Sequence, residues 1–133
     1  MVSEFEKKVA EEYNLRFLKY GAQPKSSLWF SEQRQTLRFD SIIRTMKRNQ
    51  APRHFSINDI GCGYGGFLKH LQDNFSNDRF SYVGFDLAKS PVEYCERNYC
   101  KKGVQFYCSG TPLVMADYSV MSGTFNYAPD LLS

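Results

Sequence analysis

The segment 59–66, Asp-Ile-Gly-Cys-Gly-Tyr-Gly-Gly, constrains the fold of this chain more than any other feature. Phe55, Ile57 and Ile60 predict a strand before it. Apolar residues at helical spacing predict a helix after it: Phe67, Leu68, Leu71 and Phe75. A strand that turns directly into a helix needs positive φ angles, which glycine adopts at little cost. Because the first amides of a helix can bind an anionic group, the turn predicts a ligand site.

Strand and helix patterns alternate after this turn. Apolar runs predict strands over 80–85, 104–108 and 116–121. Ser90-Pro91-Val92-Glu93 predicts a helix start, with Ser90 as the N-cap, Pro91 at the first helical position and Glu93 completing a capping box. Alternation of this kind predicts an α/β fold with a parallel sheet and right-handed crossovers.

Two helices are predicted before the first strand. Residues 4–19 carry one apolar stripe, made of Phe5, Val9, Tyr13 and Phe17. Residues 31–48 form the second helix, with Ser31 as its N-cap. Its residues expected to face inward are Leu37, Ile42, Ile43 and Met46.

Length and composition exclude several classes of protein. A chain of 133 residues is enough for one domain, and its spread of charges, with a net charge of +3, lacks the dense basic cluster of a nucleic-acid-binding protein. The four cysteines form no C-x-x-C pair, so no metal site is expected. No secretory segment opens the chain and no apolar run reaches membrane-spanning length. We expect a cytoplasmic protein with reduced thiols and no membrane partner.

The glycines fit two cofactor templates. Gly61, Gly63 and Gly66 match G-x-G-x-x-G of dinucleotide-binding proteins, whereas Gly61, Gly63 and Gly65 match G-x-G-x-G. Asp59 favours the second template, because dinucleotide enzymes usually have an apolar residue there. Asp86 ends the next strand, where a carboxylate can accept both hydroxyl groups of a ribose. The alternative is that Asp86 only caps the turn into the following helix.

The run Asp59-Ile60-Gly61-Cys62-Gly63 resembles the signature of class I S-adenosylmethionine-dependent methyltransferases, and the resemblance covers residues 55–127. It implies a Rossmann-like, partial doubly wound parallel sheet with two N-terminal helices. Asp59 would then orient the amino-acid end of S-adenosylmethionine, and Asp86 would bind its ribose. The turn residues Gly61, Cys62, Gly63 and Gly65 would lie against methionine and ribose.

The resemblance also implies the remainder of the site. Leu87 would cover one face of the adenine, and Cys108, Ser109 and Gly110 would edge it. The reaction centre would lie near Ser122, Phe125 and Asn126. Residues 1–133 would form one domain, with a core over 53–127 and a helical lid over 1–50 that brings Trp29, Gln33 and Arg38 to the cofactor. Arg38 would pair with the cofactor carboxylate or with Asp59.

The chain departs from the family after the fourth strand, because the fold normally has seven strands in the order 3-2-1-4-5-7-6. An uncovered strand edge invites association, so we expect a homodimer or a swapped assembly through that edge, or a fragment of a longer enzyme. With no base near the fourth strand, catalysis would rest on positioning a small-molecule acceptor. The alternatives are a protein that binds S-adenosylmethionine or S-adenosylhomocysteine without catalysis, and a nicotinamide-binding module.

Overall fold

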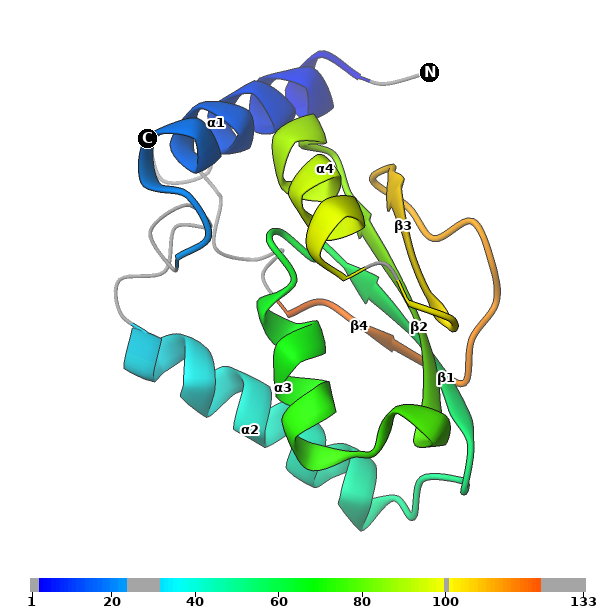
Figure 1. Ribbon diagram of the computed structural model, residues 1–133. Coiled ribbons are helices and arrows are strands. Elements are labelled where there is room, and N and C mark those ends of the chain that lie inside the picture. Colours follow the sequence, from blue (N-terminus) through cyan, green and yellow to red (C-terminus); the bar gives the residue numbers. More distant parts are fainter. Residues whose placement is uncertain (1–2, 24–31, 100, 123–133) are drawn as a thin grey trace.

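The computed structural model describes residues 3–23, 32–99 and 101–122, and the order of its elements is the predicted one (Figure 1). The elements are α1 (Glu4–Tyr20), α2 (Glu32–Arg48), β1 (Phe55–Ile60), α3 (Gly66–Asn74), the short 3₁₀ helix η2 (Asn77–Arg79), β2 (Phe80–Asp86), α4 (Lys89–Asn98), β3 (Val104–Cys108) and β4 (Tyr118–Val120). In these ranges no helix is long and apolar enough to cross a membrane.

The four strands form one parallel sheet in the order β3-β2-β1-β4. Ile57 of β1 lies beside Tyr82 of β2 on one side and beside Tyr118 of β4 on the other. This confirms the predicted α/β, Rossmann-like sheet. Since all strands run the same way, their carboxyl ends share one edge, which we call the carboxyl edge. Figure 1 shows α1 lying at this edge, next to the start of α4.

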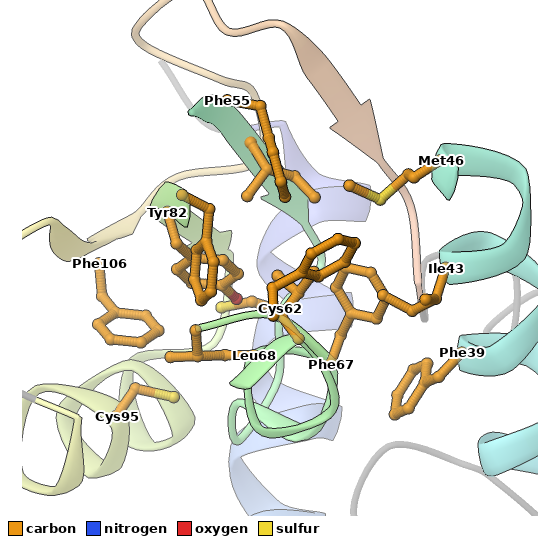
Figure 2. Close-up of a cluster of buried hydrophobic side chains, with 14 of the residues drawn as sticks. Phe39, Ile43, Met46, Phe55, Cys62, Phe67, Leu68, Tyr82, Cys95 and Phe106 are labelled. Atoms are coloured by element: carbon orange, nitrogen blue, oxygen red, sulfur yellow. The ribbon is translucent and has the colours of Figure 1, made fainter. Parts of the chain in front are cut away.

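One face of the sheet carries the hydrophobic core. Figure 2 shows side chains of the sheet, α2, α3 and α4 meeting in one cluster. The fully buried members include Phe55, Ile57, Phe67, Leu68 and Tyr82. The Phe55 ring meets Phe75, Phe80 and Tyr118 at centroid distances of 5.2, 6.0 and 5.7 Å. Many of the chain's aromatic residues therefore serve packing, which fixes α3 and α4 against the sheet.

α2 packs on the outer side of α3. Phe39 meets Phe67 edge to face at 5.4 Å, and Nε2 of His70 lies 2.6 Å from Oδ1 of Asp40. A second link runs from Tyr64, whose hydroxyl donates to the buried amide oxygen of Gln35 at 3.0 Å. Since Tyr64 belongs to the glycine turn, these contacts hold α2 against both the turn and α3.

The opposite face of the sheet is covered only in part by the described residues. The segment 109–117 crosses it, and Nδ2 of Asn58 donates to the carbonyl oxygen of Val114 at 2.8 Å. Leu113, Val114 and Met115 are nevertheless exposed, Met115 at 98%. The two faces of the sheet therefore differ sharply in how much apolar surface they leave in water.

Three sequence predictions are wrong in detail. Ser90 does not cap α4: the helix begins at Lys89 after Ala88, because the Asp86 carboxylate accepts the Ala88 N–H at 2.9 Å and so starts the turn earlier. Leu37 does not face inward but is 59% exposed on α2. The fourth strand is shorter than predicted, since only Tyr118–Val120 pairs with β1.

Candidate cofactor site

The glycine turn leaves β1 through three residues with positive φ. Gly61, Gly63 and Gly65 have φ angles of +75°, +55° and +89°, and α3 starts at Gly66. At Gly65 a Cβ atom would lie only 2.7 Å from the ring of Tyr99, so both backbone and space require glycine. No side chain caps α3, so its first amide groups remain available to a ligand at the carboxyl edge.

The turn is fastened to the end of β2. The amides of Gly61 and Cys62 both donate to the carbonyl oxygen of Phe85, at 2.7 and 3.0 Å. The amide of Gly63 donates to Oδ2 of Asp86 at 2.8 Å. These bonds set the height of the turn above the sheet, which decides where a ligand can lie against the backbone.

Asp86 is half-buried where β2 ends, and each of its oxygens accepts one amide. Oδ1 accepts from Ala88 and Oδ2 from Gly63. Burial raises the pKa of the carboxyl group, and the N–H groups of Ala88, Gly63 and Leu87 oppose that rise. Asp86 therefore does cap the turn into α4, as the alternative prediction for this residue held. An ionised carboxylate has about four acceptor positions, so not all of them are taken by these amides. Ribose binding by Asp86 stays a prediction.

Asp59 is fully buried and holds three strand ends together. The Tyr82 hydroxyl on β2 donates to its Oδ2 at 2.6 Å, and the Ser122 hydroxyl after β4 donates to its Oδ1 at 2.8 Å. Burial raises the pKa of Asp59 to about 7, although both hydroxyl groups act to lower it. At neutral pH this carboxyl group is therefore close to half protonated.

Tyr82 and Gln35 are parts of this region that the sequence prediction missed. A tyrosine inside a buried strand needs a hydrogen-bond partner for its hydroxyl group. The sequence therefore indicates that Tyr82 has a polar partner, although it does not say which residue that partner is. That the partner is Asp59 depends on the register of β1 with β2, which places Tyr82 beside Ile57, two residues before Asp59. Gln35 offered no comparable signal, because it lies within a polar stretch of α2.

Cys62 is 5% exposed and its side chain lies in the hydrophobic core (Figure 2). Its hydrogen bond with Cys95 and its burial raise the pKa of the Cys62 thiol well above the usual range. Cys95 also donates to the carbonyl oxygen of Gly63 at 3.3 Å. A contact of Cys62 with a cofactor would therefore involve its backbone rather than its sulfur.

Arg38 lies at the exit of β4 rather than at Asp59. Its Nη2 donates to the carbonyl oxygen of Met121 at 3.2 Å. The two carboxylate oxygens of Asp59 instead accept hydrogen bonds from the hydroxyl groups of Tyr82 and Ser122. The proposed pairing of Arg38 with Asp59 is therefore wrong, whereas its pairing with a cofactor carboxylate stays a prediction. Gln33 is exposed on α2. Trp29, Phe125 and Asn126 lie outside the described residues.

The predicted adenine residues line a pocket at the carboxyl edge. Leu87, Ser109 and Gly110 face α1 across a hollow of about 590 Å³. That volume lies within the range of small-molecule sites. Ser122, expected at the reaction centre, is 3% exposed and bonded to Asp59. Across residues 3–23, 32–99 and 101–122, no group of three or more acidic, cysteine and histidine side chains could hold a metal ion.

The sheet is parallel, and its first strand turns through glycines onto an uncapped helix. Its second strand ends in an acidic residue, Asp86. These features together define the class of Rossmann-like proteins that bind a nucleotide cofactor. The methyltransferase domain family matches residues 58–131, and the chain belongs to this family. Its members use S-adenosylmethionine as cofactor.

Individual relatives agree with this assignment. The chain is 39% identical over 74 residues to "Putative methyltransferase Rv1506c" of Mycobacterium tuberculosis (strain ATCC 25618 / H37Rv), covering 54% of this chain and 43% of that protein. The plantazolicin methyltransferase BpumL, in a crystal structure with a triazolic desmethylPZN analog and SAH, shares the fold with a TM-score of 0.56 at 15% identity, over 90% of this chain and 49% of BpumL.

The cyclopropane synthase MmaA2 of Mycobacterium tuberculosis also shares the fold, with a TM-score of 0.54 at 14% identity, over 83% of this chain and 41% of MmaA2. The chain thus spans less than half the length of these relatives. At this level of identity the two solved structures bear on the fold alone.

Proposed function

We propose that this chain binds S-adenosylmethionine along its carboxyl edge and takes part in transfer of the methyl group to a small-molecule acceptor. The observation that carries the proposal is that Asp86 is bonded to the glycine turn through the Gly63 amide and is followed in the chain by Leu87, which lines the pocket facing α1. An amino acid, a ribose and a purine joined in line would meet these three parts in that order.

In this arrangement the amino-acid end lies against Gly61, Gly63 and Gly65, near the free amides of α3. The ribose hydroxyls reach the remaining acceptor positions of Asp86. The adenine enters the pocket formed by Leu87 and Ser109. Residues 53–127 then form the cofactor core, and residues 1–50, with Trp29 and Arg38, form the lid of a single domain.

The reaction requires alignment more than proton transfer. When bound, the cofactor supplies a methyl group already activated by a positive sulfur atom. The protein has to hold the acceptor in line and exclude water. Ser122, Phe125 and Asn126 are the proposed positioning residues beside the acceptor. The Ser122 hydroxyl is bonded to Asp59, which fixes its direction.

Calorimetric titration with S-adenosylhomocysteine and with NAD tests the cofactor. We expect binding of S-adenosylhomocysteine and a clear preference over NAD, and a preference for NAD would refute the proposal. Asp86→Ala should weaken binding of S-adenosylhomocysteine by about tenfold or more, because a charge-assisted hydrogen bond contributes about 1.5–3 kcal/mol. Asp73→Ala, on the exposed end of α3, is the matched control and should bind as the wild type does.

Incubation with labelled S-adenosylmethionine and a pooled small-molecule extract separates an enzyme from a binding protein. Transfer of label supports the enzyme. Binding without transfer supports the alternative, a protein that holds the cofactor without catalysis.

We also propose a homodimer or swapped assembly, in a cytoplasmic setting. In the described part of the chain β4 pairs only with β1, and a hollow lined by Ile42, Met46 and Val120 lies between α2 and β4. Cys62, Cys95 and Cys108 are free thiols, as a reducing compartment favours. Light scattering at micromolar concentration tests the assembly, and a monomeric mass would refute it.

A further inference from the structure

The pocket beside Leu87 has one wall from outside the α/β core. α1 lies across the carboxyl edge and contributes Glu6, Ala10 and Asn14 to this pocket (Figure 1). Leu87, Ser109 and Gly110 form the facing side at the exits of β2 and β3. A ligand in the pocket would therefore be recognised by α1 as well as by the strand ends.

The side formed by the strand ends is firmly held. The Ser109 amide donates to the carbonyl oxygen of Asp86 at 2.8 Å, and the Cys108 thiol donates to the carbonyl oxygen of Leu87 at 3.4 Å. The Ser109 hydroxyl donates to the carbonyl oxygen of Thr111 at 2.8 Å. This network ties the loop after β3 to the end of β2, directly beside Asp86.

The α1 wall is fixed as well. Oδ1 of Asn14 accepts the backbone N–H of Ser90 at 2.8 Å, and the ring of Phe17 meets Tyr94 edge to face at 5.4 Å. Both contacts join α1 to α4. Because α4 is itself packed on the sheet, the distance across the pocket is set by the fold.

Glu6 of α1 lies beside the loop after β3. Its Oε1 accepts the amide of Ser3 at 3.3 Å, while its own amide donates to the Ser3 hydroxyl at 3.1 Å, which makes a capping box. Its second oxygen points at Gly110: a Cβ there would lie 2.7 Å from Oε2 and 2.9 Å from Cδ2 of Leu87. One carboxylate oxygen thus holds the helix start while the other faces the pocket.

A carboxylate at this place distinguishes purines by their hydrogen-bonding edge. An ionised carboxylate only accepts hydrogen bonds. The exocyclic amine of adenine is a donor, whereas the oxygen at the same position of hypoxanthine is an acceptor and would repel the carboxylate. We propose that Glu6 is a specificity-determining residue that accepts a hydrogen bond from the 6-amino group of the cofactor's adenine. This inference rests on the proposed binding of S-adenosylmethionine.

Glu6→Gln is the informative variant, because glutamine also completes a capping box and keeps the shape of the side chain. Unlike the carboxylate, its amide can donate to an oxygen at position 6. The ligands are S-adenosylhomocysteine and S-inosylhomocysteine, titrated by calorimetry into wild type and variant. Wild type should prefer the adenosyl ligand by about ten- to a hundredfold, and the variant should lose most of that preference. Circular dichroism should show the variant folded.

Glu11→Gln is the matched control, because Glu11 also lines the pocket from α1 but lies one and a half turns further along the helix. It should keep the wild-type preference. An unchanged preference in Glu6→Gln, or an equal loss in Glu11→Gln, would overturn the role of Glu6 while leaving cofactor binding intact. If wild type binds neither ligand, the proposed function fails and this inference fails with it.

Discussion

At the scale of single residues, Asp59 of β1 is the hydrogen-bond acceptor that links the ends of three strands. Its carboxylate accepts hydrogen bonds from the hydroxyl groups of Tyr82 on β2 and Ser122 after β4. Both donors are buried, as Asp59 is. A buried carboxyl group is tolerated only when its hydrogen bonds are satisfied. The identity of residue 82 should therefore affect both stability and the protonation of Asp59.

Tyr82→Phe removes one of the two donors without changing the packed ring. We expect a loss of about 1–3 kcal/mol in the free energy of unfolding, measured by urea denaturation, because Asp59 keeps its burial but loses a bond. Tyr107→Phe is the control, since the Tyr107 hydroxyl lies on an exposed residue and donates only weakly to Gln105 at 3.3 Å. Equal effects of the two substitutions would contradict this account of Tyr82.

The raised pKa of Asp59 also predicts how stability depends on pH. The folded protein holds a proton there up to about pH 7, whereas the unfolded chain releases it near 3.8. Because the folded state binds more protons between these values, the free energy of unfolding should fall as pH rises from about 4 to 7. The full difference corresponds to about 4 kcal/mol.

Urea denaturation between pH 5 and 8 measures this slope, and Asp59→Asn should reduce it. The variant should keep a smaller slope of the same sign, because burial raises the pKa of Asp86 as well. Identical slopes in the wild type and the variant would show that Asp59 does not carry the effect.

At the scale of elements, the glycine turn depends on two separate demands at Gly65. Its φ of +89° disfavours any side chain, and the ring of Tyr99 fills the space that a Cβ would need. Gly65→Ala should therefore cost more stability than the 1–2 kcal/mol or so of the left-handed backbone alone. It should also weaken binding of S-adenosylhomocysteine by displacing the start of α3.

Gly103→Ala is the control for the backbone effect. Its φ of +83° is similar, but the nearest atom to an added Cβ is 3.9 Å away. Thermal unfolding of both variants separates strain from crowding. Equal losses at the two positions would mean that the contact with Tyr99 does not matter.

The elements themselves were largely readable from the sequence. Apolar runs and helical spacing predict β1 and β3 with the bounds observed, and the other helices and strands within a few residues. The start of α4 was not readable, since it depends on the side chain of Asp86 competing with Ser90 for the role of cap. Contacts between elements, such as Tyr82 with Asp59 or Glu6 beside Gly110, depend on register and helix placement, which periodicity does not contain.

At the scale of the whole molecule, the sheet is unequally covered. α3 and α4 bury one face, whereas on the described part of the other face Leu113, Val114 and Met115 remain exposed. Exposed apolar surface of this kind favours association with other molecules. The chain's behaviour in concentrated solution should therefore depend on the segment 109–117.

Met115→Lys should lower self-association at high concentration while leaving stability within about 0.5 kcal/mol of wild type, because this side chain is 98% exposed. Light scattering across a concentration series measures the first quantity, and urea denaturation the second. Thr111→Lys, in the same segment, controls for the added charge. If both variants reduce association equally, net charge rather than apolar surface is responsible.

The link between Asn14 and Ser90 joins residues 76 positions apart in the chain. During synthesis α1 leaves the ribosome first, yet it can dock only after α4 has been made. Until then its apolar stripe has no α4 to pack against, and the pocket beside Leu87 has no outer wall. We therefore expect the proposed site to form late in folding. A nascent chain released before α4 is synthesised would contain the glycine turn but would lack the complete pocket proposed for the adenine.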